Sequence, residues 1–204
     1  MDIVVATKNK GKLREIAAIL GGLGVNLLSL ADYPDCPDVV EDGATFKDNA
    51  LKKALAVAAY TGKPALADDS GLCVDALDGA PGVYSARFSG PGADDLTNNT
   101  KLLDLLKALP DNRRGAKFVC VLAVAWPLSF GKKPIVVRGE VRGRIASGPK
   151  GARGFGYDPV FYYHPARLTF AEMGPEAKNK VSHRYRALVK FQEALLLSFQ
   201  VKRK

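Results

Sequence analysis

The stretch at residues 118–126 constrains the fold most, because nine consecutive residues are apolar. It reads Phe-Val-Cys-Val-Leu-Ala-Val-Ala-Trp. A strand with one solvent-exposed face alternates apolar and polar side chains, whereas an unbroken apolar run of this length is typical of a central strand covered on both faces. Residues 135–145 are more mixed, and the turn between Pro127 and Pro134 would let them pair with this strand. We therefore expect a large sheet with helices packed on it.

Segments of helical and extended character alternate along the rest of the chain. Apolar runs at 3–6 and 25–30 predict strands, and helices are predicted after each of them and at the C-terminal end. Thr45 and Asp48 resemble a capping box, and Gly62 follows the helix that they begin. With 204 residues, 47% of them hydrophobic, the chain fits one domain. The predicted fold class is α/β, and residues 1–204 are predicted to form a single domain with two lobes.

Two adjacent acids, Asp68 and Asp69, stand between short apolar runs, where we expect a strand to end. Neighbouring carboxylates repel each other, and beside apolar residues they are costly unless a proton or cation compensates them. A divalent metal is the natural cation. The following Ser70 and Gly71 add a small hydroxyl and a backbone that a ligand can approach closely. The alternative is a polar turn, since Asp, Ser and Gly are common turn formers.

A polar turn at Thr7–Lys12 connects the first strand to the first helix and is rich in lysine. Backbone N–H groups, the helix dipole and the lysines would all point towards a phosphate placed there. The turn is not a Walker A loop, because the leading glycine is absent. A simple Asn9 cap is the alternative. In the helix after Thr45, Asn49 and Lys53 share one face, which is either functional or merely solvated.

Glycines flank Phe155 and Tyr157 in the segment 149–159. Such a backbone can be approached by a flat ring, although a plain Gly-rich loop is the alternative. Cationic residues at 183, 184 and 186 begin the last helix. Cations at a helix N-terminus oppose the dipole and therefore indicate an anion or acceptor nearby.

The charge is unevenly distributed. Residues 1–100 carry 9 basic and 14 acidic side chains and the remainder 21 and 7, which gives a net charge of +9. This asymmetry fits either a nucleic-acid-binding half or a metal region beside one that attracts a polyanionic small molecule. Three widely spaced cysteines suggest neither a zinc site nor a disulfide framework. Without a basic leader or a membrane-length apolar run, we expect a soluble, cytoplasmic protein with no membrane partner.

These segments together resemble the inosine triphosphate pyrophosphatase family, whose bacterial members are dITP/XTP pyrophosphatases. The resemblance spans nearly the whole chain and rests on six ordered motifs. They are Ala6-Thr7-Lys8-Asn9-Lys10-Gly11-Lys12, Gly43-Ala44-Thr45-Phe46 with Asn49-Ala50, Ala67-Asp68-Asp69-Ser70-Gly71-Leu72, Gly79-Ala80-Pro81-Gly82-Val83-Tyr84-Ser85-Ala86-Arg87, Gly154-Phe155-Gly156-Tyr157-Asp158-Pro159 and Ser182-His183-Arg184. Asp48 departs from the glutamate frequent in the family, a conservative change that affects helix capping more than chemistry.

The resemblance implies a role for each motif. The triphosphate of a purine nucleotide would be bound by Thr7, Lys8, Asn9, Lys10, Gly11 and Lys12. Glu41 and Asp69 would bind Mg²⁺, with Asp69 also the proton acceptor, and Lys53, Ser70 and Lys178 would contact the substrate. The base pocket would be formed by Phe155, Gly156, Tyr157 and Asp158, and the base would be recognised by His183 and Arg184. The family also implies an elongated mixed β-sheet flanked by helices, two lobes around a central cleft, and a homodimer.

The expected reaction is Mg²⁺-dependent hydrolysis of ITP, dITP or XTP to the monophosphate and pyrophosphate, with no nucleic-acid partner. Carboxylates bind the metal, while the metal and lysines neutralise the developing phosphate charge. Two rival classes remain. A basic nucleic-acid-binding module would leave Glu41, Asp68 and Asp69 unexplained, and a phosphate-ester phosphatase would be expected to carry an Asp-x-Asp nucleophile pattern, which is missing.

Overall fold

The computed structural model describes residues 1–21 and 24–200, with side chains up to residue 197. Seven strands form one sheet in the order β2-β1-β3-β4-β5-β6-β7. The pairs β1–β2 and β1–β3 are parallel, whereas β5–β6 and β6–β7 are antiparallel, so the mixed sheet is confirmed. The strands are β1 (Asp2–Val5), β2 (Asn26–Ser29), β3 (Ala65–Val74), β4 (Gly115–Ala125), β5 (Ile135–Ile145), β6 (Phe161–Tyr163) and β7 (Leu168–Thr169).

Five α-helices accompany the sheet. They are α1 (Lys10–Leu20), α2 (Phe46–Thr61), α3 (Asp95–Leu106), α4 (Phe170–Lys178) and α5 (His183–Gln200). Thr45 caps α2 through its hydroxyl, and Gly62 ends it with φ of 63°, a left-handed conformation that glycine adopts at little cost. Over the described part of the chain, we find no helix with the length and apolar character needed to cross a bilayer.

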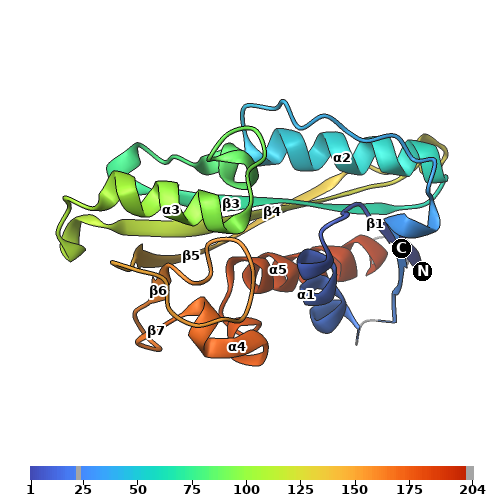
Figure 1. Ribbon diagram of the computed structural model, residues 1–204. Helices are drawn as coiled ribbons and strands as arrows, with labels where there is room; N and C mark the ends of the chain where they lie inside the picture. The colour runs from blue at the N-terminus through green and yellow to red at the C-terminus, as the bar shows by residue number, and fades with distance from the viewer. Residues whose placement is uncertain (22–23, 201–204) are drawn as a thin grey trace. The chain divides into compact units, whose positions relative to one another are not determined.

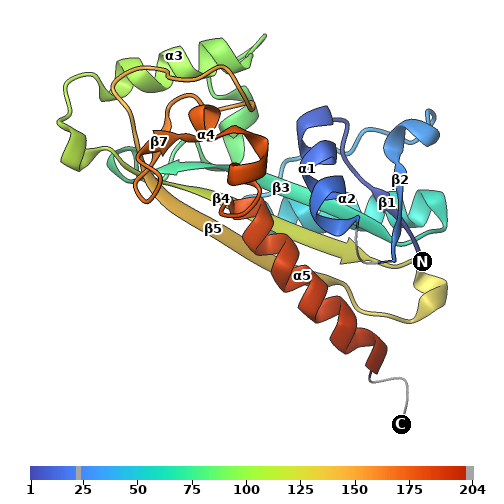
Figure 2. The same cartoon turned by 90° about the horizontal axis from the view of Figure 1, so that it is seen from below.

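The chain divides into two compact units, and β3, β4 and β5 each contribute residues to both. The first unit contains Met1–Asp69, Cys120–Gly139 and the segment from Arg184 onward. Its core joins apolar side chains of α1, α5, β1, β3 and β4. Helices α1 and α5 cover one face of these strands and α2 the other (Figure 1), and α5 runs along the face of β4 (Figure 2). Four residues after Leu195, Phe199 falls at helical spacing and is predicted on the buried side of α5, but it lies outside the described side chains.

The second unit contains Ser70–Val119 and Glu140–His183. Its core includes Leu102 and Leu106 of α3 and a cluster of rings from β4, β6 and α4. Phe118 lies 4.7 Å from Phe161 and 5.9 Å from Phe170, measured between ring centroids. Aromatic pairs at such distances add stability beyond the area they bury.

The prediction that β4 is a central strand is confirmed, since it is fourth of seven in the sheet and its residues 118–125 are buried. One expectation was wrong. Asp68 and Asp69 lie in the middle of the ten-residue strand β3 and not at its end. Helix α4 was not among the predicted elements, and it contains Gly174 and Pro175, which normally break helices. In α4 the break is real but local: Gly174 has φ of 76° and kinks the helix, which then continues.

Candidate functional site

Asp68 is the counter-ion of two cations in the first unit. Its side chain is fully buried, Oδ1 lies 2.6 Å from Nζ of Lys12, and Oδ2 accepts a hydrogen bond from Nε of Arg184 at 2.8 Å. The Cys120 thiol also donates a hydrogen bond to Oδ2, with a distance of 3.1 Å between sulfur and oxygen. Burial alone would raise the pKa of Asp68, but the charges of Arg184 and Lys12 hold it well below its usual value. Asp68 is therefore a buried anion.

Arg184, in the first turn of α5, joins this anion to a second one. Only 1% of its side chain is exposed, and its guanidinium also pairs with the carboxylate of Glu15 from α1. Burial opposes the charged form, but the two carboxylates outweigh it and raise the pKa of Arg184. The acceptor expected at the start of this helix is thus a pair of carboxylates. We call Glu15, Arg184, Asp68 and Lys12 the buried charge network.

Asp69 has different surroundings from Asp68, although the two are adjacent. Its Oδ1 is 4.0 Å from Nζ of Lys53, which lies closer, at 3.0 Å, to Oε2 of Glu41. Burial raises the pKa of Asp69 to about 6; Lys53 and Lys12 act against this rise and Glu41 adds to it. Its buried Oδ2 has no hydrogen-bond partner among the residues described. Asp69 can therefore gain or lose a proton near neutral pH, and it has an oxygen that can accept a further ligand.

Helix α2 places Lys53 between these carboxylates. Asn49 and Lys53 lie on the same face of the helix and are 1% and 9% exposed, so the solvated alternative is wrong. The Lys53 ammonium also donates to the carbonyl of Asp68 at 2.8 Å. Oδ1 of Asn49 accepts from the backbone N–H of Gly43 at 2.7 Å, which anchors the loop that carries Glu41. A Cβ at Gly43 would lie 2.7 Å from that same oxygen, so the close approach requires glycine.

The turn Thr7–Lys12 adopts the predicted Asn9 cap. Oδ1 of Asn9 accepts from the backbone N–H groups of Gly11 at 2.8 Å and Lys12 at 3.0 Å. Lys8, Asn9 and Lys10 are exposed, and Nζ of Lys8 lies 2.5 Å from Oδ1 of exposed Asp38. Cap geometry and phosphate binding are compatible, because exposed lysines at a helix N-terminus remain available to an anion. The phosphate role stays a prediction.

In the second unit, Asp158 and Lys178 hold the loop that carries Phe155. Oδ2 of Asp158 accepts from the Phe155 N–H at 2.9 Å and lies 2.5 Å from Nζ of Lys178, an almost fully buried pair. The same ammonium lies 4.7 Å from the centre of the Phe155 ring. Gly154 has φ of 84°, and a Cβ there would come within 2.2 Å of the Asp158 carboxylate. The half-buried Phe155 ring thus has a defined position.

The next two residues of this loop are Gly156, which is bonded by side chains of α3, and Tyr157, which is bonded to a backbone carbonyl of the segment before α3. Asp95 and Asn99 of α3 both bond the peptide groups of Gly156. The Tyr157 hydroxyl donates to the carbonyl of Ser85 at 2.8 Å. Burial, together with the charge of Asp95, raises the pKa of Tyr157, so its phenol stays protonated. This segment is thus held by hydrogen bonds at Gly156 and Tyr157, and its role as a base pocket stays a prediction.

Two further predicted residues lie in the second unit. His183 is 4% exposed and stacks on Phe118, with ring centroids 4.7 Å apart and planes 12° from parallel. Ser70 is half-buried and follows Asp69 in β3.

The structure thus groups the predicted residues in two sets, one in each unit. The first set lies around β3 and the starts of α1 and α5 in the first unit, and consists of Lys12, Glu41, Lys53, Asp69 and Arg184. Phe155, Gly156, Tyr157, Asp158 and Lys178 form the second set. Within residues 1–21 and 24–200, there is no group of three or more His, Cys, Asp or Glu side chains that could hold a metal ion without other ligands.

Sequence reasoning missed Glu15, Asp95 and Asn99. Glu15 immediately precedes the buried Ile16 in α1, and a carboxylate beside an apolar stripe is a signal for a buried partner. Asp95 and Asn99 are spaced i, i+4 on a helix, which places them on one face. Neither signal names the partner, which lies far away in the sequence.

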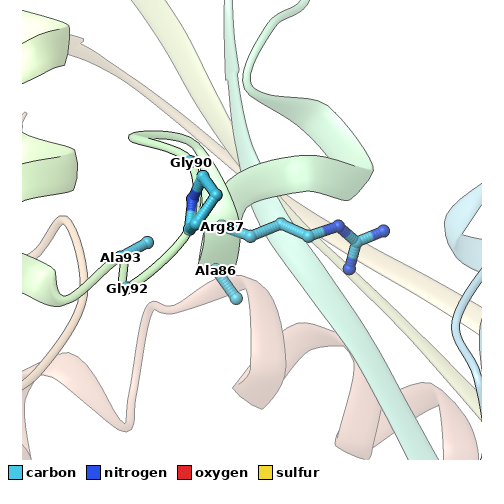
Figure 3. A pocket seen from close by; sticks show the side chains of 6 residues that line it. Ala86, Arg87, Gly90, Gly92 and Ala93 are labelled. Atoms are coloured by element: carbon cyan, nitrogen blue, oxygen red, sulfur yellow. The ribbon is translucent and has the colours of Figure 1, made fainter.

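A hollow of about 550 Å³ lies in the second unit, beside the loop that precedes α3. Figure 3 shows its lining, which comes from Ala86, Arg87 and the segment 90–93, with the Arg87 side chain extending away from that segment. The lining contains none of the predicted site residues. The guanidinium of Arg87 lies 5.1 Å from the ring centre of Tyr84.

Comparison with known proteins identifies the family. A model described as Ham1 family matches residues 3–194. The chain belongs to the Ham1 family. Its relatives include the dITP/XTP pyrophosphatases of Geobacter sulfurreducens, 57% identical over 95% of this chain and 96% of that protein, and of Desulforamulus reducens, 51% identical over 96% of each. Among solved structures, the HAM1 protein from Coxiella burnetii is 41% identical with a TM-score of 0.87, and covers 96% of this chain and 98% of its own.

Proposed function

We propose that this Ham1-family protein is a Mg²⁺-dependent pyrophosphatase that hydrolyses ITP, dITP and XTP. A water oxygen attacks the α-phosphorus, and the bond from that phosphorus to the oxygen bridging the α- and β-phosphates breaks. The water gives up a proton, pyrophosphate leaves, and the nucleoside monophosphate remains. The names of the Geobacter and Desulforamulus relatives support this reaction, as does the chemistry of the first unit. Its cellular role is then to remove deaminated purines from the nucleotide pool.

Asp69 is the observation that carries the proposal. A general base is most effective when its pKa is near the working pH, and in the metal-free protein burial raises the pKa of Asp69 to about 6. The adjacent Asp68 has the opposite character, because its cation partners hold its pKa well below the usual range. Two neighbouring carboxylates with pKa values driven apart indicate two different tasks. Asp69 accepts the proton of the attacking water, and Asp68 remains a permanent anion.

The residues present fit a Mg²⁺ ion shared with the substrate. Mg²⁺ in nucleotide sites usually takes one or two carboxylates, with phosphate oxygens and water completing its ligands. Glu41 and Asp69 are such carboxylates, and the unpartnered Oδ2 of Asp69 is a buried oxygen in need of a cation or donor. Bound there, the ion would neutralise charge on the triphosphate.

Cationic side chains supply the rest of the phosphate chemistry. Lys53 lies between Glu41 and Asp69, and Lys12 pairs with Asp68, so both ammonium groups are already fixed close to the proposed base. Fixed charges aimed at developing negative charge lower a barrier more than mobile ones, because they need no reorganisation. The turn Thr7–Lys12 then binds the triphosphate through its exposed lysines.

Base recognition is assigned to Phe155, His183 and Arg184. Phe155 stacks on any purine, so it contributes affinity more than choice. Hypoxanthine and xanthine carry a 6-oxo acceptor where adenine carries a 6-amino donor. Donors from His183 and Arg184 match the former and face a donor in the latter, which supports a preference of roughly 10² to 10⁴ in kcat/KM.

A panel of nucleotides tests the proposal. ITP, dITP, XTP, ATP and GTP are incubated with Mg²⁺, and pyrophosphate and orthophosphate are measured separately. We expect pyrophosphate from the first three and little product from ATP. Asp104→Asn, which changes an exposed acid on α3, serves as the control for Asp69→Asn. Orthophosphate as the product would indicate a phosphatase, and salt-sensitive DNA binding without turnover would indicate a nucleic-acid-binding module.

A further inference from the structure

Two side chains of α3 hold Gly156 from both of its polar groups. Oδ2 of Asp95 accepts from the Gly156 N–H at 2.6 Å, and Nδ2 of Asn99 donates to the Gly156 carbonyl at 2.9 Å. The two side chains stand one helical turn apart and form a clamp, which we call the α3 clamp. Gly156 has φ of 62°, a conformation that side-chain-bearing residues seldom adopt.

The α3 clamp completes the fixation of Phe155. On its N-terminal side, the Phe155 N–H bonds Asp158, and the ring lies under the Lys178 ammonium. The carbonyl of the peptide that follows Phe155 accepts a hydrogen bond from the Asp158 N–H at 3.3 Å, and the N–H of the same peptide, which belongs to Gly156, donates to Asp95. Asn99 is 8% exposed, so its bond is largely shielded from competing water. The ring direction therefore depends on α3.

We propose that Asp95 and Asn99 are positioning residues that set the affinity for the purine base by preorienting Phe155. The inference rests on the proposed function, in which Phe155 stacks on the base. A loop already in its bound conformation loses less conformational freedom when a ligand arrives, so the clamp strengthens binding without touching the nucleotide. It acts on the base and not on the phosphates.

Asn98 provides a matched control on the same helix. It is 4% exposed, and its side chain bonds a different loop: Oδ1 accepts from the Ser89 N–H at 2.7 Å and Nδ2 donates to the Ala86 carbonyl at 3.3 Å. Asn98→Ala should therefore cost α3 comparable packing and hydrogen bonding while leaving Gly156 held. Exposed Asp104 offers the corresponding control for Asp95, because Asp104→Ala removes an acid from the same helix.

Steady-state kinetics separates positioning from general destabilisation. Asn99→Asp keeps the shape but turns an acceptor towards the Gly156 carbonyl, and should raise KM for ITP roughly tenfold with kcat within about twofold. Asp95→Ala should raise KM for ITP roughly threefold, a smaller effect because the hydrogen bond from Gly156 to Asp95 is exposed to solvent. Asp95→Asn keeps an acceptor oxygen, so its KM for ITP should be close to that of the parent. Competitive inhibition by inorganic tripolyphosphate, which has no base, should stay unchanged in all three variants. Both control variants should keep the parental KM.

Hydrogen exchange of the Gly156 amide tests the clamp without any turnover. We expect faster exchange in Asp95→Ala and Asn99→Asp than in the parent, and parental exchange in Asn98→Ala. Unchanged exchange would overturn the inference, as would a loss of tripolyphosphate inhibition parallel to the loss of ITP affinity. If the parent binds ITP in calorimetry but does not hydrolyse it, the proposed function fails while Asn99-dependent affinity still supports the clamp. If the parent binds no ITP, both fail.

Discussion

Replacing Asp69 with Asn should stabilise the metal-free protein while it greatly slows the reaction. The unfolded chain releases this proton near pH 3.8 and the folded protein near pH 6, so between these values the folded state binds more protons. Stability therefore falls as pH rises through this window, and above about pH 6 the full cost of the buried charge is present. The difference between the two pKa values corresponds to about 3 kcal/mol.

Asp68→Asn is the matched variant with the opposite sign. The pKa of Asp68 lies below its usual value, so its ionised form contributes stability above pH 3.8 that is lost only as pH falls through the lower, folded value. Removing this carboxylate leaves Arg184 and Lys12 without their shared anion. Breaking one side of a buried ion pair costs about 3 to 5 kcal/mol. Two adjacent aspartates should thus respond in opposite directions.

Urea unfolding with EDTA at pH 4 and pH 8 measures both effects. We expect Asp69→Asn to match the parent near pH 4 and to exceed it by about 2 to 3 kcal/mol at pH 8, where Asp68→Asn is less stable than the parent. Turnover of ITP with Mg²⁺ should drop by roughly 10² or more in Asp69→Asn. A destabilised Asp69→Asn at pH 8, or the same gain at both pH values, would refute the burial argument. Near-normal turnover would remove Asp69 from the mechanism.

Three further predictions concern the base and the assembly. Arg184→Ala should reduce the ratio of kcat/KM for ITP over ATP, chiefly through slower ITP turnover, and an unchanged ratio in a folded variant would contradict base reading by Arg184. Phe155→Ala should raise KM for ITP and ATP to a similar degree, whereas a loss confined to one nucleotide would mean that Phe155 selects the base. Light scattering at micromolar concentration should give roughly twice the chain mass of 21.8 kDa, and a monomer would exclude the homodimer.

Much of the fold follows from local patterns. The apolar run at 118–126 predicted a central strand because only a strand covered on both faces can use so many apolar side chains in succession. Thr45 and Gly62 marked the ends of α2 because each satisfies a backbone requirement of a helix terminus. Helix α4 escaped prediction because Gly174 and Pro175 lie inside it, and both residues have low helix propensity.

The candidate site was predictable in its residue types but not in its pairings. The adjacent acids indicated a functional site, yet their different characters come from Arg184, Lys12 and Lys53, two of which lie far from them in the sequence. The α3 clamp was equally hidden, because Asp95 and Gly156 are separated by 61 residues. Long-range ion pairs and hydrogen bonds depend on the fold, so a single sequence shows the groups and not their partners.

Hydrolysis of ITP in ¹⁸O-labelled water tests the central claim most directly. Attack of water at the α-phosphorus places one labelled oxygen in the monophosphate and none in pyrophosphate, and mass spectrometry of both products reads this out. We predict labelled IMP and unlabelled pyrophosphate. Label in pyrophosphate would mean attack at the β-phosphorus and would contradict the assignment of Asp69, Lys53 and Lys12 to an α-phosphorus displacement.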